Sequence, residues 1–145
     1  MKDKLTGLWT RKKLEEHTKE NLNIILIDIN KLMVINDKFG HIVGDSIIKN
    51  VARVIENNTF NDLCVRYGGN LFLIYTEKEK DFGNFIKNKI EEDSFLKEKN
   101  ITVEFGFESY NPFDSFKVRF VNADKKLYEA KSIRVYKKNH KHWIM

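Results

Sequence analysis

Asp28 is the residue whose type and position in this sequence point most directly to chemistry with metal ions and phosphates. It comes near the end of the apolar run NIILIDI, at residues 23–29. An acid at the end of a buried strand can share divalent cations with a second acid nearby. Two such ions, about 3.5–4 Å apart, activate a hydroxyl nucleophile and stabilise a departing oxygen. Taken alone, however, Asp28 is better interpreted as an ordinary acid at a strand end.

A second candidate is the stretch around two glycines, which reads RYGGNLFLIY at residues 66–75. Apolar runs flank Gly68 and Gly69, a pattern that predicts two antiparallel strands joined by a tight glycine turn. Bare glycine at such a turn also lets a ligand come close to the backbone. The next two residues are Asn70 and Leu71. Neither is an acid, so this hairpin does not supply the second carboxylate of a metal site.

Three further polar residues have plain structural interpretations when each is considered alone. Asn36 precedes an Asp, and this pair favours a turn. Asp45 is a suitable N-cap for a helix at residues 46–57. Lys131 is one lysine among many on a basic stretch.

The elements that must position these residues alternate between helix and strand. Strand patterns fall at residues 23–29, 63–67, 71–75 and 101–107, and helical patterns at residues 10–21, 46–57, 81–90 and 114–131. Thr10 is the expected cap of the first helix, and Phe82, Phe85, Ile86 and Ile90 share a face of the third. A hairpin imposes antiparallel pairing, and helix-separated strands require crossovers. We therefore expect an α+β fold with a mostly antiparallel central sheet flanked by helices.

The composition is that of one soluble globular domain, because 41% of the 145 residues are hydrophobic and 32% are charged. The formal net charge is +5, and much of the excess lies in KKLYEAKSIRVYKKNHKH, residues 125–142. A basic tail can bind phosphates, nucleic acid or anionic lipid. A solvated helix face with a frayed end is the simpler interpretation, so we expect no nucleic-acid partner.

Cys64 is the single cysteine, and its place in a predicted strand favours a buried thiol over a metal ligand. No apolar run approaches the roughly 20 residues that span a bilayer. No signal peptide precedes the first charged turn. We therefore expect a cytoplasmic chain without membrane insertion.

Four sequence blocks occur in an order and at a spacing that carry more information than any single residue. They are DKLTGLWTRKKL at 3–14, DINKLMVINDKFGHIVGD at 28–45, RYGGNLF at 66–72 and NADKKLYEAK at 122–131. Together they resemble the GGDEF domain, the family of diguanylate cyclases, over nearly the whole chain. The resemblance implies a cyclase-like palm fold, with one domain at residues 1–138 and a C-terminal tail at 139–145.

Active members of this family condense two GTP molecules into cyclic di-GMP, with one GTP on each domain of a transient dimer and with Mg²⁺ or Mn²⁺. The resemblance implies that Asp28 matches the first metal-binding acid. Asn36 and Asp45 match the pair that hydrogen-bonds guanine. Lys131 matches a lysine that contacts the phosphates, and Gly68–Gly69 matches the turn that the triphosphate approaches.

The family signature is altered at the positions that would bind metal. It reads Gly68, Gly69, Asn70, Leu71, Phe72, with a neutral amide and an alkyl group in the two acidic places. Hard divalent ions prefer carboxylate oxygens, so Asp28 would form only a weak, incomplete metal site. Losing one charge-stabilising group at such a site costs on the order of 10²–10³ in rate. We therefore expect no functional catalytic residues and no useful cyclase activity.

Further departures agree with this interpretation. Asn30 stands where the family usually has a second Asp, and Leu32-Met33 replaces the usual Phe-Lys, so a phosphate-facing lysine is missing. After Lys131, a segment one residue shorter reads Ser132-Ile133-Arg134. The family's inhibitory site, Arg-x-x-Asp, keeps Asp62 but has Thr59 in place of arginine. We therefore expect no binding of cyclic di-GMP at this inhibitory site.

Three functions remain open at this point. The first is a degenerate domain of a bacterial signalling protein that acts as a regulatory or dimerisation module, with a protein partner or input domain and no required cofactor. The second is a GTP-binding allosteric sensor, which would need Mg²⁺ or Mn²⁺ only if GTP is bound. The third is an active cyclase, which is disfavoured because Leu71 cannot bind a cation.

Overall fold

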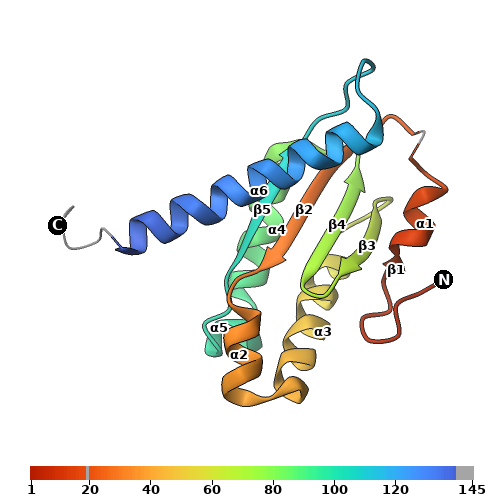
Figure 1. The fold of residues 1–145 in the computed structure, drawn as a ribbon. Coiled ribbons are helices and arrows are strands. Elements are labelled where there is room, and N and C mark those ends of the chain that lie inside the picture. Colours follow the sequence, from red (N-terminus) through yellow and green to blue (C-terminus); the bar gives the residue numbers. More distant parts are fainter. Residues whose placement is uncertain (19, 140–145) are drawn as a thin grey trace.

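Figure 1 shows the fold in a computed structural model, which describes residues 1–18 and 20–139, the last six of these by their helical backbone alone. The elements are β1 (Trp9–Thr10), α1 (Arg11–Glu15), β2 (Asn23–Ile29), α2 (Leu32–Phe39), α3 (His41–Asn57), β3 (Leu63–Gly68), β4 (Leu71–Thr76), α4 (Lys80–Glu92), α5 (Ser94–Glu98), β5 (Val103–Glu108) and α6 (Phe116–Asn139). Of the tail predicted at residues 139–145, Asn139 ends α6 and the rest lies outside the described residues.

A five-stranded sheet forms the centre of the molecule, in the order β1-β3-β4-β2-β5. β1 pairs in parallel with β3, and the other pairs are antiparallel. α1 and α6 pack on one face, whereas α3, α4 and α5 pack on the other (Figure 1). The expected α+β architecture, with a mostly antiparallel sheet flanked by helices, is confirmed.

β2 is the buried central strand that its apolar sequence predicts, because β4 and β5 pair with its two edges. Ile25 and Ile27 face the core under α3 and α4, and Ile24 and Leu26 face the core under α6. Burying a side chain of this size contributes roughly 1.5–3 kcal/mol. Because side chains alternate along a strand, Asp28 also falls on the α6 face.

The helix predicted at residues 46–57 begins earlier, at His41, so the prediction that Asp45 is its N-cap is wrong. Gly40 holds the N-cap position with a φ of 88°, a conformation that glycine adopts readily and that separates α3 from α2. Asp45 lies inside the helix and is exposed. The sequence pattern placed the start of the helix five residues beyond its true start, because the buried apolar side chains of α3 begin only at Ile47.

Within the described residues, β1, α2 and α5 have no counterpart in the predicted order, since each is short and α2 buries only Leu32. α1 is shorter than predicted, and Thr10 holds its N-cap position without capping it, because the hydroxyl donates to the Met1 carbonyl at 3.3 Å. Phe85, predicted on the buried face of α4, is 43% exposed. The buried residues of α4 are Gly83, Ile86 and Ile90.

Cys64 is buried in β3, as predicted. Burial raises the pKa of its thiol to about 11, so the thiol stays protonated at neutral pH. No helix in the described part of the chain is both long and apolar enough to cross a membrane.

Candidate functional site

The end of β2 and the turn between β3 and β4 lie at the same end of the sheet, next to α2 (Figure 1). Asp28 is directly opposite Leu71 in the register of β2 and β4. Beyond this pair, the Ile29 N–H donates to the Asn70 carbonyl over 3.2 Å. Antiparallel pairing therefore brings Asp28 beside the glycine turn.

Lys131 reaches the same place from α6 and forms an ion pair with Asp28 Oδ2. The Asp28 side chain is 17% exposed and that of Lys131 is 33% exposed, so the pair is partly buried between sheet and helix. The second carboxylate oxygen, Asp28 Oδ1, is buried and has no hydrogen-bond partner among the described residues. An ammonium group of the chain itself therefore neutralises the acid at the end of β2.

The residues that follow the two glycines also make contacts within the chain. The Asn70 amide donates from Nδ2 to the Ile29 carbonyl, 2.9 Å away. Leu71 is partly buried and packs against the apolar cluster beneath α6, whereas Phe72 is fully buried on the other face. In residues 1–18 and 20–139, no group of three or more His, Cys, Asp or Glu side chains could hold a metal ion.

Gly68 and Gly69 have no need to be glycine for the sake of the turn itself. Neither adopts a positive φ, unlike Gly7 and Gly40. A Cβ added at either position would meet no atom within 4 Å. The predicted hairpin is present, and its two glycines leave an open approach to the backbone.

Asn36 and Asp45 come from adjacent helices that pack on each other. A Cβ on Gly44 would overlap the Asn36 amide oxygen, so glycine at 44 makes room for the Asn36 side chain. That oxygen is buried and has no hydrogen-bond partner in the described part of the chain. Asp45 follows directly and is exposed. Met33, in the place of the missing lysine, is 77% exposed.

Arg66 organises this end of the sheet, a role that sequence reasoning did not assign. Its Nη2 donates to the Gly69 carbonyl at 2.9 Å, and its Nη1 donates to Asp3 Oδ2 at 3.2 Å. Asp3 in turn accepts from the Thr6 N–H and hydroxyl at 2.9 and 2.7 Å. Burial works to raise the pKa of Asp3, but these hydrogen bonds outweigh it and hold the pKa below its usual value. The signal was available, because Asp3, Thr6 and Arg66 all belong to the recognised blocks.

The family model described as "Diguanylate cyclase, GGDEF domain" matches residues 1–135 of this chain. The chain belongs to the GGDEF family. Diguanylate cyclase A of Treponema denticola is 37% identical over 123 residues, which cover 78% of this chain and 33% of that protein. Diguanylate cyclase VdcA of Vibrio cholerae is 28% identical over 149 residues, covering 90% of this chain and 44% of that protein. This GGDEF chain thus spans a third to less than half of the length of these relatives.

Solved structures show the same fold. The GGDEF domain of DgcB from Caulobacter crescentus, in complex with c-di-GMP, superposes with a TM-score of 0.78 at 24% identity, covering 90% of each chain. The diguanylate cyclase SiaD of Pseudomonas aeruginosa, in complex with its activator SiaC, gives a TM-score of 0.76 at 22% identity, covering 90% of this chain and 58% of that one. At these identities the likeness shows the fold alone.

Thr59 and Asp62, the residues expected at the inhibitory site, make hydrogen bonds within the chain. Asp62 accepts hydrogen bonds from the Thr76 hydroxyl at 2.5 Å and from Lys78 Nζ at 2.8 Å, and its side chain is 2% exposed. The Thr59 hydroxyl donates to the Glu56 carbonyl at 3.2 Å. Both side chains therefore stabilise the segment that leads into β3.

Asn30, which replaces the second Asp of the family motif, is buried and points toward β5. Its Nδ2 donates to Thr102 Oγ1 at 3.0 Å, and its N–H donates to the Thr102 carbonyl at 2.9 Å. Leu32, in the place of the usual Phe, is buried in the core under α3. These two changes therefore act in packing. The side chain of Arg134, in the shortened segment after Lys131, lies outside the described residues.

Proposed function

We propose that this GGDEF domain does not synthesise cyclic di-GMP and instead acts as a regulatory or interaction module, contacting a protein partner or an input domain. The observation that carries the proposal is the ion pair between Lys131 and Asp28. It gives the acid that would bind a divalent ion a cation from the same chain. A cytoplasmic setting suits such a module, because its buried thiol is reduced.

Two Mg²⁺ or Mn²⁺ ions do not suit the groups at this site. Such ions prefer several oxygen ligands, chiefly carboxylates. Among Asp28, Asn70 and Leu71, the three positions expected to face the metal, Asp28 is the one acid. Lys131 is paired with it. The carbonyl of the next residue, Ile29, accepts a hydrogen bond from the Asn70 amide. Leu71 adds apolar surface opposite Asp28. Asp28 Oδ1 is the one carboxylate oxygen left unpaired among these groups, which is too little charge and too few ligands to hold two ions.

The purified domain should be incubated with GTP and Mg²⁺ or Mn²⁺, and the products separated by chromatography. An Asp28→Ala variant is the control. We expect no cyclic di-GMP from either protein. Product from the unmodified chain above this control would overturn the proposal and restore the active cyclase.

A second candidate is a sensor that binds GTP without converting it. It is favoured by Gly68 and Gly69, because their exposed backbone serves no conformational need and a Cβ there would meet nothing in the chain. A triphosphate at this turn would explain both glycines. Asn36 and Asp45 would then recognise guanine, and Lys131 would have to leave Asp28 to contact the phosphates.

Calorimetry with GTP separates the two candidates, with Gly69→Val as the decisive variant. A Cβ at residue 69 meets no atom within 4 Å and the backbone there has no positive φ, so we expect the variant to fold as the unmodified protein does. Micromolar GTP binding that Gly69→Val abolishes, with no cyclic di-GMP formed, would support the sensor. An absence of GTP binding would exclude the sensor and favour the interaction module. GTP binding that Gly69→Val does not alter would exclude the turn as the phosphate site.

A further inference from the structure

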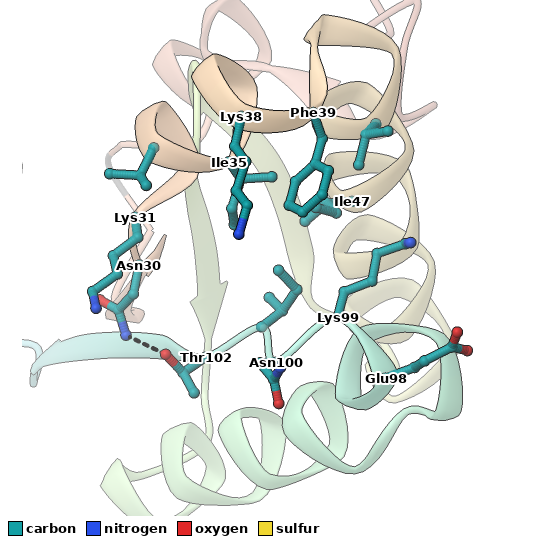
Figure 2. Close-up of a pocket in the computed structure, with 13 residues that line it drawn as sticks. Asn30, Lys31, Ile35, Lys38, Phe39, Ile47, Glu98, Lys99, Asn100 and Thr102 are labelled. Carbon is teal, nitrogen blue, oxygen red and sulfur yellow. Dashed lines mark hydrogen bonds between the residues drawn. The ribbon is translucent and has the colours of Figure 1, made fainter.

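A cavity of about 620 Å³ lies between α2, the start of α3 and the loop from α5 to β5 (Figure 2). Apolar side chains form much of its wall, namely those of Ile35, Val43, Ile47 and Ile101. Its volume falls within the range of small-molecule sites, about 300–1,000 Å³. Three separate segments of the chain enclose it, which favours a compact ligand over an extended one.

This cavity is separate from the place where β2 meets the hairpin. Asn36 and Asp45 do not line it, and neither do the glycines of the turn. α2 presents different side chains to the two places, since Asn36 packs against α3 whereas Ile35 and Lys38 point into the cavity (Figure 2). A ligand here would therefore not occupy the nucleotide position implied by family membership.

Positive charge surrounds the cavity. Lys31, Lys38 and Lys99 line it, with Glu98 as the one acid of the lining. Figure 2 shows Lys38 extending from α2 into the space above the α5–β5 loop. Among the described residues neither Lys38 nor Lys99 has an ion-pair partner, and their ammonium groups lie 5.2 and 5.1 Å from aromatic ring centroids. The ammonium charges of Lys38 and Lys99, which no carboxylate pairs with, favour an anionic ligand.

Exposed apolar side chains and two residues with left-handed backbone conformation lie around the cavity. Val34 is 60% exposed and Phe39 is 58% exposed, although both line the cavity. Lys31 and Asn100, on opposite sides, have φ of 59° and 58°, a left-handed conformation that is uncommon outside glycine. Asn100 follows the C-cap of α5, where asparagine often adopts this conformation, so Lys31 is the more unusual of the two.

We propose that this cavity binds a small organic anion with an apolar body. Its carboxylate, sulfonate or phosphate group would contact Lys38 and Lys99, and its aromatic or aliphatic part would cover Val34, Ile35 and Phe39. The site is distinct from the one discussed above, because Asp28, Asn36 and Asp45 do not line it and neither do the two glycines. Asn30, an altered position of the family motif, does line the cavity, and its side chain is bonded to Thr102.

Two fluorescent probes test the site: 1-anilinonaphthalene-8-sulfonate, which is anionic, and N-phenyl-1-naphthylamine, which has the same rings without the charge. The unmodified chain should bind the sulfonate saturably, one per molecule. The double variant Lys38→Gln, Lys99→Gln should weaken sulfonate binding by about tenfold or more, because hydrogen bonds to charged groups are strong. Its affinity for the neutral probe should change by less than about threefold, since the apolar wall is intact.

The matched control is Lys12→Gln with Lys49→Gln, which removes the same charge from exposed lysines outside the cavity. It should leave both affinities unchanged. The methyl resonances of Val34, Val43 and Ile101 should shift when the sulfonate binds. Failure of the sulfonate to bind saturably, equal losses in the two double variants, or displacement of the sulfonate by GTP would each overturn the proposal.

Discussion

Asp28 shows how much a single acid depends on its neighbours. In the register of the sheet it stands opposite Leu71, and α6 brings Lys131 onto its Oδ2. The Asn70 amide donates a hydrogen bond to the carbonyl of the adjacent residue, Ile29. Asp28 Oδ2 and the Ile29 carbonyl, two oxygen atoms that could face a cation, are therefore each paired with a nitrogen group of the chain.

The double variant Asn70→Asp, Leu71→Glu tests whether metal binding can be restored. Without divalent ions we expect the free energy of unfolding to fall by about 1–3 kcal/mol, because the hydrogen bond to Ile29 is lost and two carboxylates face Asp28. Mn²⁺ should then raise the unfolding temperature of the variant and strengthen its binding of GTP. Thermal unfolding with and without Mn²⁺ measures the first effect, and calorimetry measures the second.

The unmodified chain is the control in that experiment and should not respond to Mn²⁺. If Mn²⁺ does not stabilise the double variant either and its affinity for GTP is unchanged, Asn70 and Leu71 are not what prevents metal and GTP binding. Met33, which is exposed where the family has a lysine, and the segment around Ile133 would then be the positions to restore next.

The Lys131–Asp28 ion pair can be tested by removing its cation. Lys131→Met should lower the free energy of unfolding by about 1 kcal/mol, because the partly buried Asp28 loses its partner. Urea unfolding monitored by circular dichroism gives this value. Lys125→Met, at an exposed position of the same helix, should change stability by less than about 0.5 kcal/mol. Equal effects of the two substitutions would mean that the ion pair contributes nothing.

At the scale of elements, Arg66 couples the N-terminal turn to the β3–β4 hairpin. One guanidinium group bonds the Asp3 carboxylate and the Gly69 carbonyl, so two segments far apart in sequence share an anchor. Gly7 completes the N-terminal turn with a φ of 77°, and its N–H donates to the Asp3 carbonyl at 2.8 Å. Arg66 thus holds the glycine turn through the Gly69 carbonyl, and the space beside the Cα atoms of Gly68 and Gly69 stays open.

This anchor predicts a pH dependence. The pKa of Asp3 is lower in the folded chain than in the unfolded one, so its contribution is fully present above about pH 4 and is lost as pH falls through the folded pKa. Asp3→Asn should therefore destabilise the protein by about 1 kcal/mol at pH 7 and by progressively less below pH 4. Urea unfolding at several pH values between 7 and 3 measures the difference.

Asp37→Asn is the matched control for Asp3→Asn, because Asp37 is exposed on α2. Its effect on the free energy of unfolding should be small at every pH. A constant difference between the unmodified chain and Asp3→Asn down to pH 3 would contradict the assigned role of the Asp3–Arg66 anchor.

At the scale of the whole molecule, two apolar cores hold the sheet between its helix layers. One lies under α3, α4 and α5 and the other under α6 and α1. Gly106 permits the close docking of α6, because a Cβ there would overlap the backbone at Ala123 and Leu127. Both cores are built from apolar side chains of the chain itself, and we expect them to hold the fold without a ligand at the site.

Removal of divalent ions should therefore leave global stability unchanged. We expect the unfolding temperature in excess EDTA to match that in millimolar Mg²⁺ within about 1 °C, since a ligand stabilises a protein only by binding its folded form. Differential scanning calorimetry measures this directly. A clear rise with Mg²⁺ would mean that the folded chain binds the ion and would contradict the proposed absence of a metal site.

Much of this protein was predictable from sequence, because residue identity and local periodicity are properties of short segments. The apolar run of β2, the hairpin around Gly68 and the recognised sequence blocks led to the α+β fold and the GGDEF family. The absence of acids at Asn70 and Leu71 is likewise a fact of sequence. Element starts were less predictable, as at Asp45, because the burial pattern of α3 begins after its first turn.

Only the tertiary structure decided how these residues are partnered. Lys131 meets Asp28 because α6 docks across the sheet, and Arg66 meets Asp3 because β3 runs beside the N-terminal turn. The cavity beside Lys38 exists because α2 and the α5–β5 loop approach each other from distant parts of the chain. Such contacts depend on long-range packing, which no local pattern records. The sequence by itself therefore determined the family and the absence of acids at residues 70 and 71. The fold decided which groups contact Asp28.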